Sequence, residues 1–451
     1  MQLLRIDSRN EDVSSKLRLL RTKLSPRGDI VSVASRQRTL EIFGEALTPT
    51  QVVRRICQDI SEHGLSSLLE YCNKIDQVSL TAEQLRVSED ELRSALQKAD
   101  KKFLDAVRRI RDNIREFQQA ILHKNVRTER PGGYLVERYC PLRRVGLCVP
   151  GGAAAYPSTV LMTAVPAQVA GVQEIAVMAP PTAFGAYNID MLATCYELGI
   201  TEVYRMGGAQ GVAAFAYGVE GIPKTDKIVG PGNLFVALAK RFVYGEVDID
   251  SIAGPSEVVV IVDSSTNPLY TAYDILAQAE HSPGASILIG WDAAVLDATI
   301  QAIEEQIGNV ERGKLAQQSL EEFGAVILAN DADEACRLAN EMAPEHLHIA
   351  TENAEELADK ISCAGAIFLG NMTPVAVGDY AAGPSHVLPT SGTARFASGL
   401  TCNDFLRANS LLFFNRDGLA RLAPDIEIIA TKEGLTAHRE SVRIRLKEQE
   451  S

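Results

Sequence analysis

Histidine, carboxylate and amide side chains gather in a few short segments of the chain, and such side chains can bind a metal ion or transfer protons. Gln278 and His281 stand three residues apart in QAEH, so both would project from one face of a helix toward one ion. Asp379 lies in VGDYAAGPSH, and Glu433 and His438 lie in KEGLTAH. Nitrogen and oxygen ligands without thiolate suit zinc or a similar divalent ion. Taken singly, each histidine is more often a structural residue than a ligand, and the HExxH motif of zinc proteases is absent.

A second chemical signature is the adjacent pair Glu345 and His346 in APEHLHI. Imidazole titrates near neutral pH and a carboxylate can accept a proton from water, so this pair could act as acid and base. The alternative is a surface turn ahead of a strand over 347–350. Neighbouring residues of a regular strand point to opposite faces, so the pair can serve one site only if the backbone leaves the strand at residues 344–346.

The elements that would position these residues begin near residue 145, where short β-branched runs alternate with helix-length segments. The expected strands span 145–149, 174–178, 202–206, 226–229, 257–262, 286–289, 325–328 and 366–369. The expected helices between them include 188–198, 267–281 and 331–342. This alternation predicts an α/β fold with parallel sheets covered on both faces, and it places binding sites at the carboxyl ends of the strands.

Glycine and proline clusters beside the expected strands, such as PGG at 150–152 and GPG at 230–232, could let backbone N–H groups approach a phosphate. Tight turns are the simpler explanation, because GxGxxG and GxxxxGK[ST] are both absent. Ahead of this region, Thr81 and Ser88 each begin a capping box. Apolar residues then recur at threes and fours from 92 to 121, which predicts one long packing helix.

Composition excludes several functional classes. The chain has 451 residues, of which 46% are hydrophobic and 23% charged, as in an ordinary folded protein. Its 45 basic and 58 acidic residues give a net charge of −13, so nucleic acid and anionic membranes are poor partners. No apolar run is long enough for a membrane span, no signal peptide is recognisable, and the eight cysteines form no CxxC pair. We therefore expect a cytoplasmic protein with reduced thiols.

Several long motifs follow one another along the chain. They include RVGLCVPGG at 144–152, YPSTVLMTAVPAQVAG at 156–171, GGAQGVAAFAYG, DKIVGPGN, IAGPSE, LAQAEH, APEHLHI, VAVGDYAAGPSHVLPT and KEGLTAH. In this order, and from about residue 17 to 446, the chain resembles the histidinol dehydrogenase family. The resemblance implies a zinc-dependent oxidation of L-histidinol to L-histidine, the last step of histidine biosynthesis. Two NAD⁺ are used, and L-histidinaldehyde stays in the site between the steps.

The resemblance also implies roles for single residues. One zinc ion per subunit would be held by Gln278, His281, Asp379 and His438, and completed by the imidazole and amino nitrogens of the substrate. His346 would take the hydroxyl proton, and Glu345 would then activate a water to attack the aldehyde. The substrate would contact the zinc ligands and the catalytic pair, together with Ser256 and Glu433.

NAD would contact Gln210 and Asn233, and also Cys148, where the family usually has tyrosine. A thiol cannot stack or reach as a phenol does, so we expect weaker NAD binding at this position. His386 is a secondary site candidate, because Ser385 precedes it where the family commonly has asparagine.

The implied architecture has two incomplete Rossmann-like domains, one inserted in the other, with small helical extensions at both ends. We expect an N-terminal extension at 1–42, a main domain with the substrate and metal site, an inserted NAD domain at 149–253, and a C-terminal segment at 401–451. The main domain would combine 43–148 with 254–400. The C-terminal segment would cross a homodimer, so that Glu433 and His438 complete the partner's site.

Other functions remain open at this point. A sister dehydrogenase could keep zinc and NAD and oxidise another small alcohol, although the carboxylate of Glu433 suits an amine-bearing substrate. A non-catalytic NAD- or metal-binding protein would not need both Glu345 and His346. A zinc hydrolase would need no nicotinamide at all.

Overall fold

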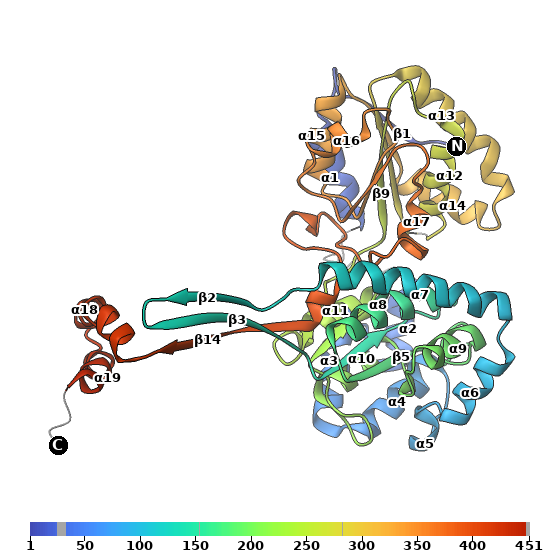
Figure 1. Ribbon diagram of the computed structural model, residues 1–451. Coiled ribbons are helices and arrows are strands. Elements are labelled where there is room, and N and C mark those ends of the chain that lie inside the picture. Colours follow the sequence, from blue (N-terminus) through green and yellow to red (C-terminus); the bar gives the residue numbers. More distant parts are fainter. Residues whose placement is uncertain (25–32, 153, 282, 448–451) are drawn as a thin grey trace.

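The computed structural model describes residues 1–24, 33–152, 154–281 and 283–447. Two parallel β-sheets form the body of the protein, one above the other in Figure 1, and a long arm projects from it. The two sheets with helices on both faces confirm the expected α/β class. Among the described residues, no helix is both long and apolar enough to cross a membrane.

The upper sheet has six parallel strands in the order β1-β11-β10-β9-β12-β13. They are β1 (Leu4–Asp7), β9 (Glu257–Val262), β10 (Ala285–Gly290), β11 (Ala325–Leu328), β12 (His346–Ile349) and β13 (Ala366–Leu369). Along β9, Val258, Val260 and Val262 pack with α12 (Pro268–Ala279), α13 (Ala293–Gln306) and α14 (Gly313–Phe323). Val259 and Ile261 pack on the other side with α1 (Val13–Leu24), α15 (Ala332–Met342) and α16 (Ala354–Ala358). This alternation covers both faces of the sheet.

The lower sheet has five parallel strands in the order β6-β5-β4-β7-β8. They are β4 (Arg144–Cys148), β5 (Glu174–Ala179), β6 (Val203–Arg205), β7 (Lys227–Val229) and β8 (Asp248–Ile249). One face packs against α6 (Glu89–Lys98), α7 (Lys101–Ile121), α8 (Pro157–Ala170) and α9 (Ile189–Glu197). The other face packs against α3 (Pro49–His63), α4 (Leu65–Asp76), α10 (Gly208–Tyr217) and α11 (Leu234–Val243).

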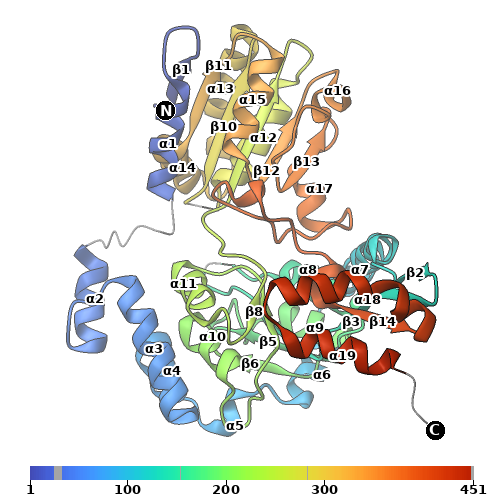
Figure 2. The same ribbon diagram turned by 90° about the vertical axis from the view of Figure 1, so that its left-hand side faces the viewer.

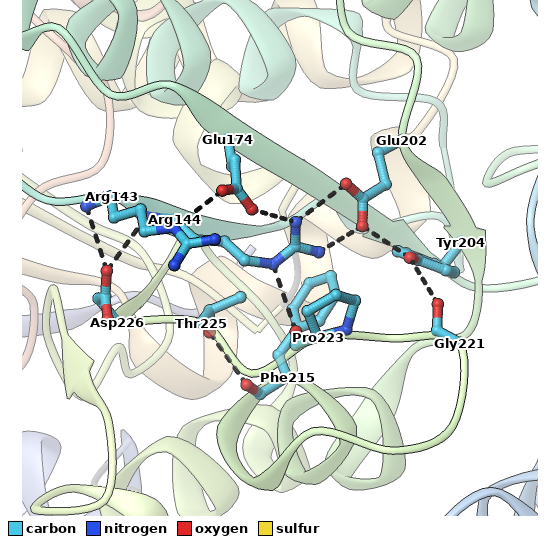
Figure 3. Close-up of polar contacts among 10 residues, drawn as sticks. All are labelled: Arg143, Arg144, Glu174, Glu202, Tyr204, Phe215, Gly221, Pro223, Thr225 and Asp226. Carbon is cyan, nitrogen blue, oxygen red and sulfur yellow. Dashed lines mark hydrogen bonds and ion pairs between the residues drawn. The ribbon is translucent and has the colours of Figure 1, made fainter.

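A cluster of charges around the buried Arg144 lies at the amino edge of the lower sheet (Figure 3). Arg144 begins β4, and its guanidinium bonds Glu174 at 3.2 Å and Glu202 on the neighbouring chain segments. The backbone N–H groups of Arg143 and Arg144 both donate to Asp226, each at 3.1 Å. The cluster connects the starts of β4, β5, β6 and β7, because parallel strands all begin at one edge of the sheet. The opposite, carboxyl edge is where ligands bind in sheets of this kind.

The arm is built from three antiparallel strands and two helices: β2 (Val126–Arg130), β3 (Gly133–Pro141), β14 (Leu406–Phe414), α18 (Arg416–Lys432) and α19 (Thr436–Leu446). Figure 1 shows it extending away from both sheets, and Figure 2 looks along it with α18 and α19 in front. Large apolar side chains are exposed on the arm, among them Leu412, Phe413, Ile428, Ile429 and Ile444. Each is at least half exposed, which is unusual for a single chain and typical of a surface that another chain covers.

The remaining elements are short. They are α2 (Val33–Phe43), α5 (Ala82–Leu85), α17 (Val375–Tyr380) and three 3₁₀ turns, η1 (Ile307–Asn309), η2 (Thr393–Arg395) and η3 (Cys402–Phe405). Both capping boxes are present, at Thr81 ahead of α5 and at Ser88 ahead of α6. The prediction of one long helix is wrong, because Asp100 accepts the N–H of Phe103 and starts α7 as a separate helix.

All the expected strands are present within one residue of their predicted bounds, but the sheets divide the chain differently from the expected domains. The segment 43–148 was expected beside 254–400, whereas β4 is the central strand of the lower sheet. The N-terminal extension contributes β1 to the upper sheet. The lower sheet is therefore inserted between β1 and β9, and the insertion is longer than 149–253. The difference arises because strand pairing is a long-range contact that local sequence patterns do not encode.

Gly146, in the middle of β4, offers a test of this packing. A Cβ at this position would lie 2.4 Å from Cδ2 of Phe215, whose side chain is fully buried in α10. We expect Gly146→Ala to destabilise the protein by about 1–3 kcal/mol, because a crowded core must shift to admit the methyl group. Gly308→Ala is the control, since a Cβ there meets nothing within 4 Å. The midpoints of urea unfolding measure both, and equal midpoints for the two variants would contradict the close packing.

Candidate active site

The candidate site residues lie on two sheet edges that face each other. Ser256 precedes β9 and Glu345 precedes β12, so the expected catalytic pair lies at the amino edge of the upper sheet. Cys148 ends β4 at the carboxyl edge of the lower sheet. The chain joins the two edges directly, because β8 ends at Ile249 and β9 begins at Glu257. Sites were predicted at the carboxyl ends of the strands. The expected NAD residues lie at such an edge of the lower sheet, whereas the expected catalytic pair lies at the opposite edge of the upper sheet.

Glu345 is a buried carboxylate with fixed hydrogen bonds. Its Oε2 accepts the hydroxyl of Ser256 at 2.5 Å and the backbone N–H of Glu257 at 2.8 Å. Burial raises the pKa of Glu345, and the charge of His346 and the two hydrogen bonds offset only part of that effect. The side chain is 6% exposed, so it does not belong to a surface turn. The two hydrogen bonds and the contact with His346 all involve Oε2 of the carboxylate.

His346 is the first residue of β12 and is oriented by oxygens on both sides of its ring. Nδ1 lies 3.1 Å from the carbonyl oxygen of Glu257, and Nε2 lies 3.3 Å from Oδ1 of Asp379. Burial lowers the pKa of His346, but Glu345 and Asp379 outweigh this and raise it to about 9. The backbone leaves the strand at Glu345, as the sequence required for both side chains to serve one site.

Three of the expected zinc ligands lie beside this pair. Gln278 is in the last turn of α12 and is 4% exposed, and its side-chain amide nitrogen has no hydrogen-bond partner among the described residues. His281 follows the helix in a turn, and its N–H donates to the Gln278 carbonyl at 3.2 Å. Asp379, in α17, interacts electrostatically with His281 and with His346. A buried polar group without a partner is costly. Zinc would bind the amide oxygen of Gln278, which a half-turn of the side-chain amide brings to the position of the unpartnered nitrogen.

The electrostatics of Asp379 also fit a cation. Burial raises the pKa of this carboxyl, but the hydrogen bond and charge of His346, with smaller contributions from His386 and His281, bring it below its ordinary value. Its carbonyl oxygen lies 3.0 Å from Nδ1 of His386, whose Nε2 lies 3.4 Å from Oγ1 of Thr159. The secondary candidate His386 is therefore in contact with the same residue as the catalytic histidine.

One chain does not bring all the expected ligands together. His438 and Glu433 are exposed on the arm, which Figure 1 shows far from both sheets. Within the described ranges, no group of three or more His, Cys, Asp or Glu side chains could hold a metal ion. The body of one chain supplies Gln278, His281 and Asp379 only, so the expected set lacks its fourth member there.

The expected NAD contacts lie at the carboxyl edge of the lower sheet and all have structural partners. Burial raises the pKa of the Cys148 thiol to about 12, so it is neutral. The buried amide of Gln210 donates to Asp76 at 3.0 Å, and Asn233 caps α11 by accepting the N–H groups of its first turn. Gly230, at φ +110°, packs so closely that a Cβ would lie 2.4 Å from the Cys148 carbonyl oxygen. Such close backbone approach beside a helix N-terminus fits a dinucleotide.

Sequence reasoning missed the role of Glu257 at the start of β9. Its backbone N–H contacts Glu345 and its carbonyl contacts His346. The pairing of β12 with β9 would have revealed this role, because it sets His346 beside Val258, the residue after Glu257.

Comparisons with known proteins identify the family of the chain. The family model described as histidinol dehydrogenase matches residues 45–446. Histidinol dehydrogenase of Rhodopirellula baltica is 58% identical over 440 residues, which cover 97% of this chain and 96% of the relative. That of Synechococcus sp. is 46% identical, over 87% and 91% of the two chains. The crystal structure of histidinol dehydrogenase from Elizabethkingia anophelis is 33% identical and matches with a TM-score of 0.88 over 98% of each chain. The chain belongs to the histidinol dehydrogenase family.

Proposed function

We propose that Glu345 and His346 carry out the proton transfers of the family's reaction, the oxidation of L-histidinol through L-histidinaldehyde to L-histidine. The chain is an NAD- and zinc-dependent oxidoreductase of this family (EC 1.1.1.23), acting at the last step of histidine biosynthesis. The observation that carries the proposal is the buried contact between the two side chains, 3.5 Å from Glu345 Oε2 to His346 Nδ1, beside the Asp379 carboxylate.

In the first oxidation His346 takes the proton of the substrate hydroxyl. NAD, when bound, accepts the hydride. The contact of Nδ1 with the Glu257 carbonyl places the ring proton of the neutral imidazole on Nδ1, so Nε2, 3.3 Å from Oδ1 of Asp379, is the nitrogen left to accept a proton. A base must be unprotonated to act, and the raised pKa of His346 therefore moves proton acceptance toward alkaline pH.

In the second oxidation Glu345 takes a proton from the water that attacks the aldehyde. Ser256 and the Glu257 N–H hold one carboxylate oxygen, so the other is presented in a fixed direction. Burial raises the pKa of Glu345 and makes it a stronger base than an exposed glutamate. Retention of the aldehyde in the site between the steps protects it from side reactions.

Gln278, His281 and Asp379 would hold the zinc ion together with His438 of the partner subunit. The ion supplies a fixed point that orients the amino and imidazole nitrogens of histidinol. The carboxylate of Glu433, carried on the same arm as His438, suits a substrate that bears an amino group, because it can accept a hydrogen bond from the N–H. Gln210, Asn233 and the backbone around Cys148 would contact NAD.

A homodimer in which the arm of each subunit reaches its partner explains the arm. The crossing part of 401–451 begins at β14, because Cys402 and Phe405 are buried in the core of their own chain. Exposed apolar side chains on β14, α18 and α19 need a covering surface, and the metal set of one body lacks a fourth ligand. Both needs are met if the arm of each subunit reaches the body of the other. A symmetric exchange gives two complete sites per dimer.

The yield of NADH tests the reaction. Each molecule of L-histidinol should give two molecules of NADH, because both oxidation steps transfer a hydride. The absorbance of NADH after complete consumption of a known amount of histidinol measures the ratio. A yield of one NADH would show that the reaction stops at the aldehyde.

Mixed dimers test the exchange of the arm. His438→Ala and Glu345→Gln should each inactivate the homodimer. Random mixing of the two variants should restore about one quarter of the wild-type activity, because half of the dimers are mixed and each mixed dimer has one intact site. The activity of refolded equal mixtures measures this. If mixing restores nothing, each chain uses its own His438 and the exchange is wrong.

Glu345→Gln tests the division of labour within the catalytic pair. Oxidation of added histidinaldehyde should fall about 10²–10⁴-fold, as expected on loss of a general base, and the first oxidation should fall less. Stopped-flow measurement of NADH formation from each substrate separates the steps. The exposed Glu352→Gln is the control and should leave both rates unchanged. Equal losses on both substrates would contradict the role of Glu345 as water activator.

A further inference from the structure

A second buried pair of imidazole and carboxylate lies beside the site. Nδ1 of His348 is 3.1 Å from Oδ2 of Asp274, and their side chains are 1% and 8% exposed. Nε2 of His348 lies 2.9 Å from the carbonyl oxygen of Gly370. Breaking a buried pair by removing one partner is strongly destabilising, yet such pairs are seldom more stable than apolar packing. A pair in this position therefore calls for a reason other than stability.

Asp274 and His348 lie on the same helix and strand, α12 and β12, as the site residues Gln278 and His346. Asp274 is four residues before Gln278 on α12, so the two side chains share one face of the helix. His348 is two residues after His346 on β12, so these side chains share one face of the strand. The pair thus joins the helix that ends in the metal set to the strand that begins with the catalytic histidine.

The start of α12 is held at the same place. The carbonyl of Gly370 contacts His348, and the next residue, Asn371, accepts the N–H of Asn267 at 2.8 Å. Asn267 is the N-cap of α12. The turn after β13 therefore contacts both the N-cap of α12 and the imidazole of His348, which pairs with Asp274 in the middle of that helix.

Apolar packing alone would not fix the helix along its axis. The face of α12 toward the sheet consists of small and aliphatic residues, including Ala272, Ile275 and Ala279, against the valines of β9. Such contacts are non-directional, whereas the imidazole of His348, which contacts Asp274 through one ring nitrogen and the Gly370 carbonyl through the other, has defined distances and directions. Buried polar pairs are best attested where they set register.

We propose that Asp274 and His348 are positioning residues, which hold α12 at a fixed height on β12 so that Gln278 and His346 serve one metal-bound substrate. The inference rests on the proposed metal set. It adds two residues that touch neither the ion nor the substrate and that act through Gln278 and His346.

The experiment measures how fast zinc leaves the loaded dimer. A chromogenic chelator is added in excess, well below the melting temperature, and the zinc–chelator complex is followed in time. Asp274→Asn keeps the shape of the side chain and removes its charge. We expect zinc release to accelerate about tenfold, the lower end of the effect of outer residues on metal affinity. We also expect kcat to fall with the KM for NAD unchanged, because the lower sheet is not disturbed.

Two further variants separate positioning from stability. The double variant Asp274→Leu with His348→Leu replaces the ion pair by apolar contacts, so its melting temperature should match or exceed that of the wild type while zinc release is still faster. Glu202→Gln removes one carboxylate from the charge cluster around Arg144 (Figure 3), which lies at the amino edge of the lower sheet. It should lower the melting temperature and leave zinc release unchanged.

The outcomes are distinct. Wild-type zinc release from both Asp274→Asn and the double leucine variant would overturn the inference, as would equal acceleration by Glu202→Gln. Gln278→Ala tests the metal set itself. If it leaves zinc release unchanged, the proposed ligands are wrong. If it accelerates release and Asp274→Asn does not, the ligands stand and only the positioning role fails.

Discussion

Parallel pairing of β9 with β12 is the constraint on which the active site depends. In this register His346 lies beside Val258, and the preceding residue, Glu257, offers its N–H to Glu345 and its carbonyl to His346. Both contacts come from the backbone, so the geometry of the proton-transferring pair is as rigid as the sheet. Catalytic groups must be held to within a fraction of an ångström, and a strand edge does this better than a mobile loop.

The two sheets divide the chemistry between opposite kinds of edge. The residues proposed to bind the substrate lie at the amino edge of the upper sheet, and those proposed to contact NAD lie at the carboxyl edge of the lower one. The segment after α17 joins them, because Ser385 donates to the Met162 carbonyl at 2.9 Å and the Ala381 carbonyl accepts from Asn113 at 2.9 Å. Hydride transfer needs the two reactants in contact, and these links fix the edges against each other.

Much of the local structure follows from the sequence, but the assembly of the site does not. The β-branched runs and the capping boxes at Thr81 and Ser88 determine their elements through contacts between near neighbours. The break at Asp100 was missed because the apolar stripe continues across it while a side-chain cap starts a new helix. The sequence did not show that β1 belongs to the upper sheet and β4 to the lower one, because pairing between distant strands leaves no local pattern.

The candidate ligands illustrate the same division. Their residue types came from family motifs, and Gln278, His281 and Asp379 are neighbours in the body of one chain. The residues Asp274 and His348 carry no such motif, and their pairing emerges only when α12 packs on β12.

Strand β1 has a consequence for biosynthesis. Among the described residues its strand partner is β11, and Leu4 lies beside Ala325, so β1 cannot pair until Ala325–Leu328 has been translated. The inserted lower sheet can fold during that interval, since its strands lie closer together in the chain. During translation the lower sheet could therefore fold first, while β1 stays unpaired until β11 of the upper sheet has been made.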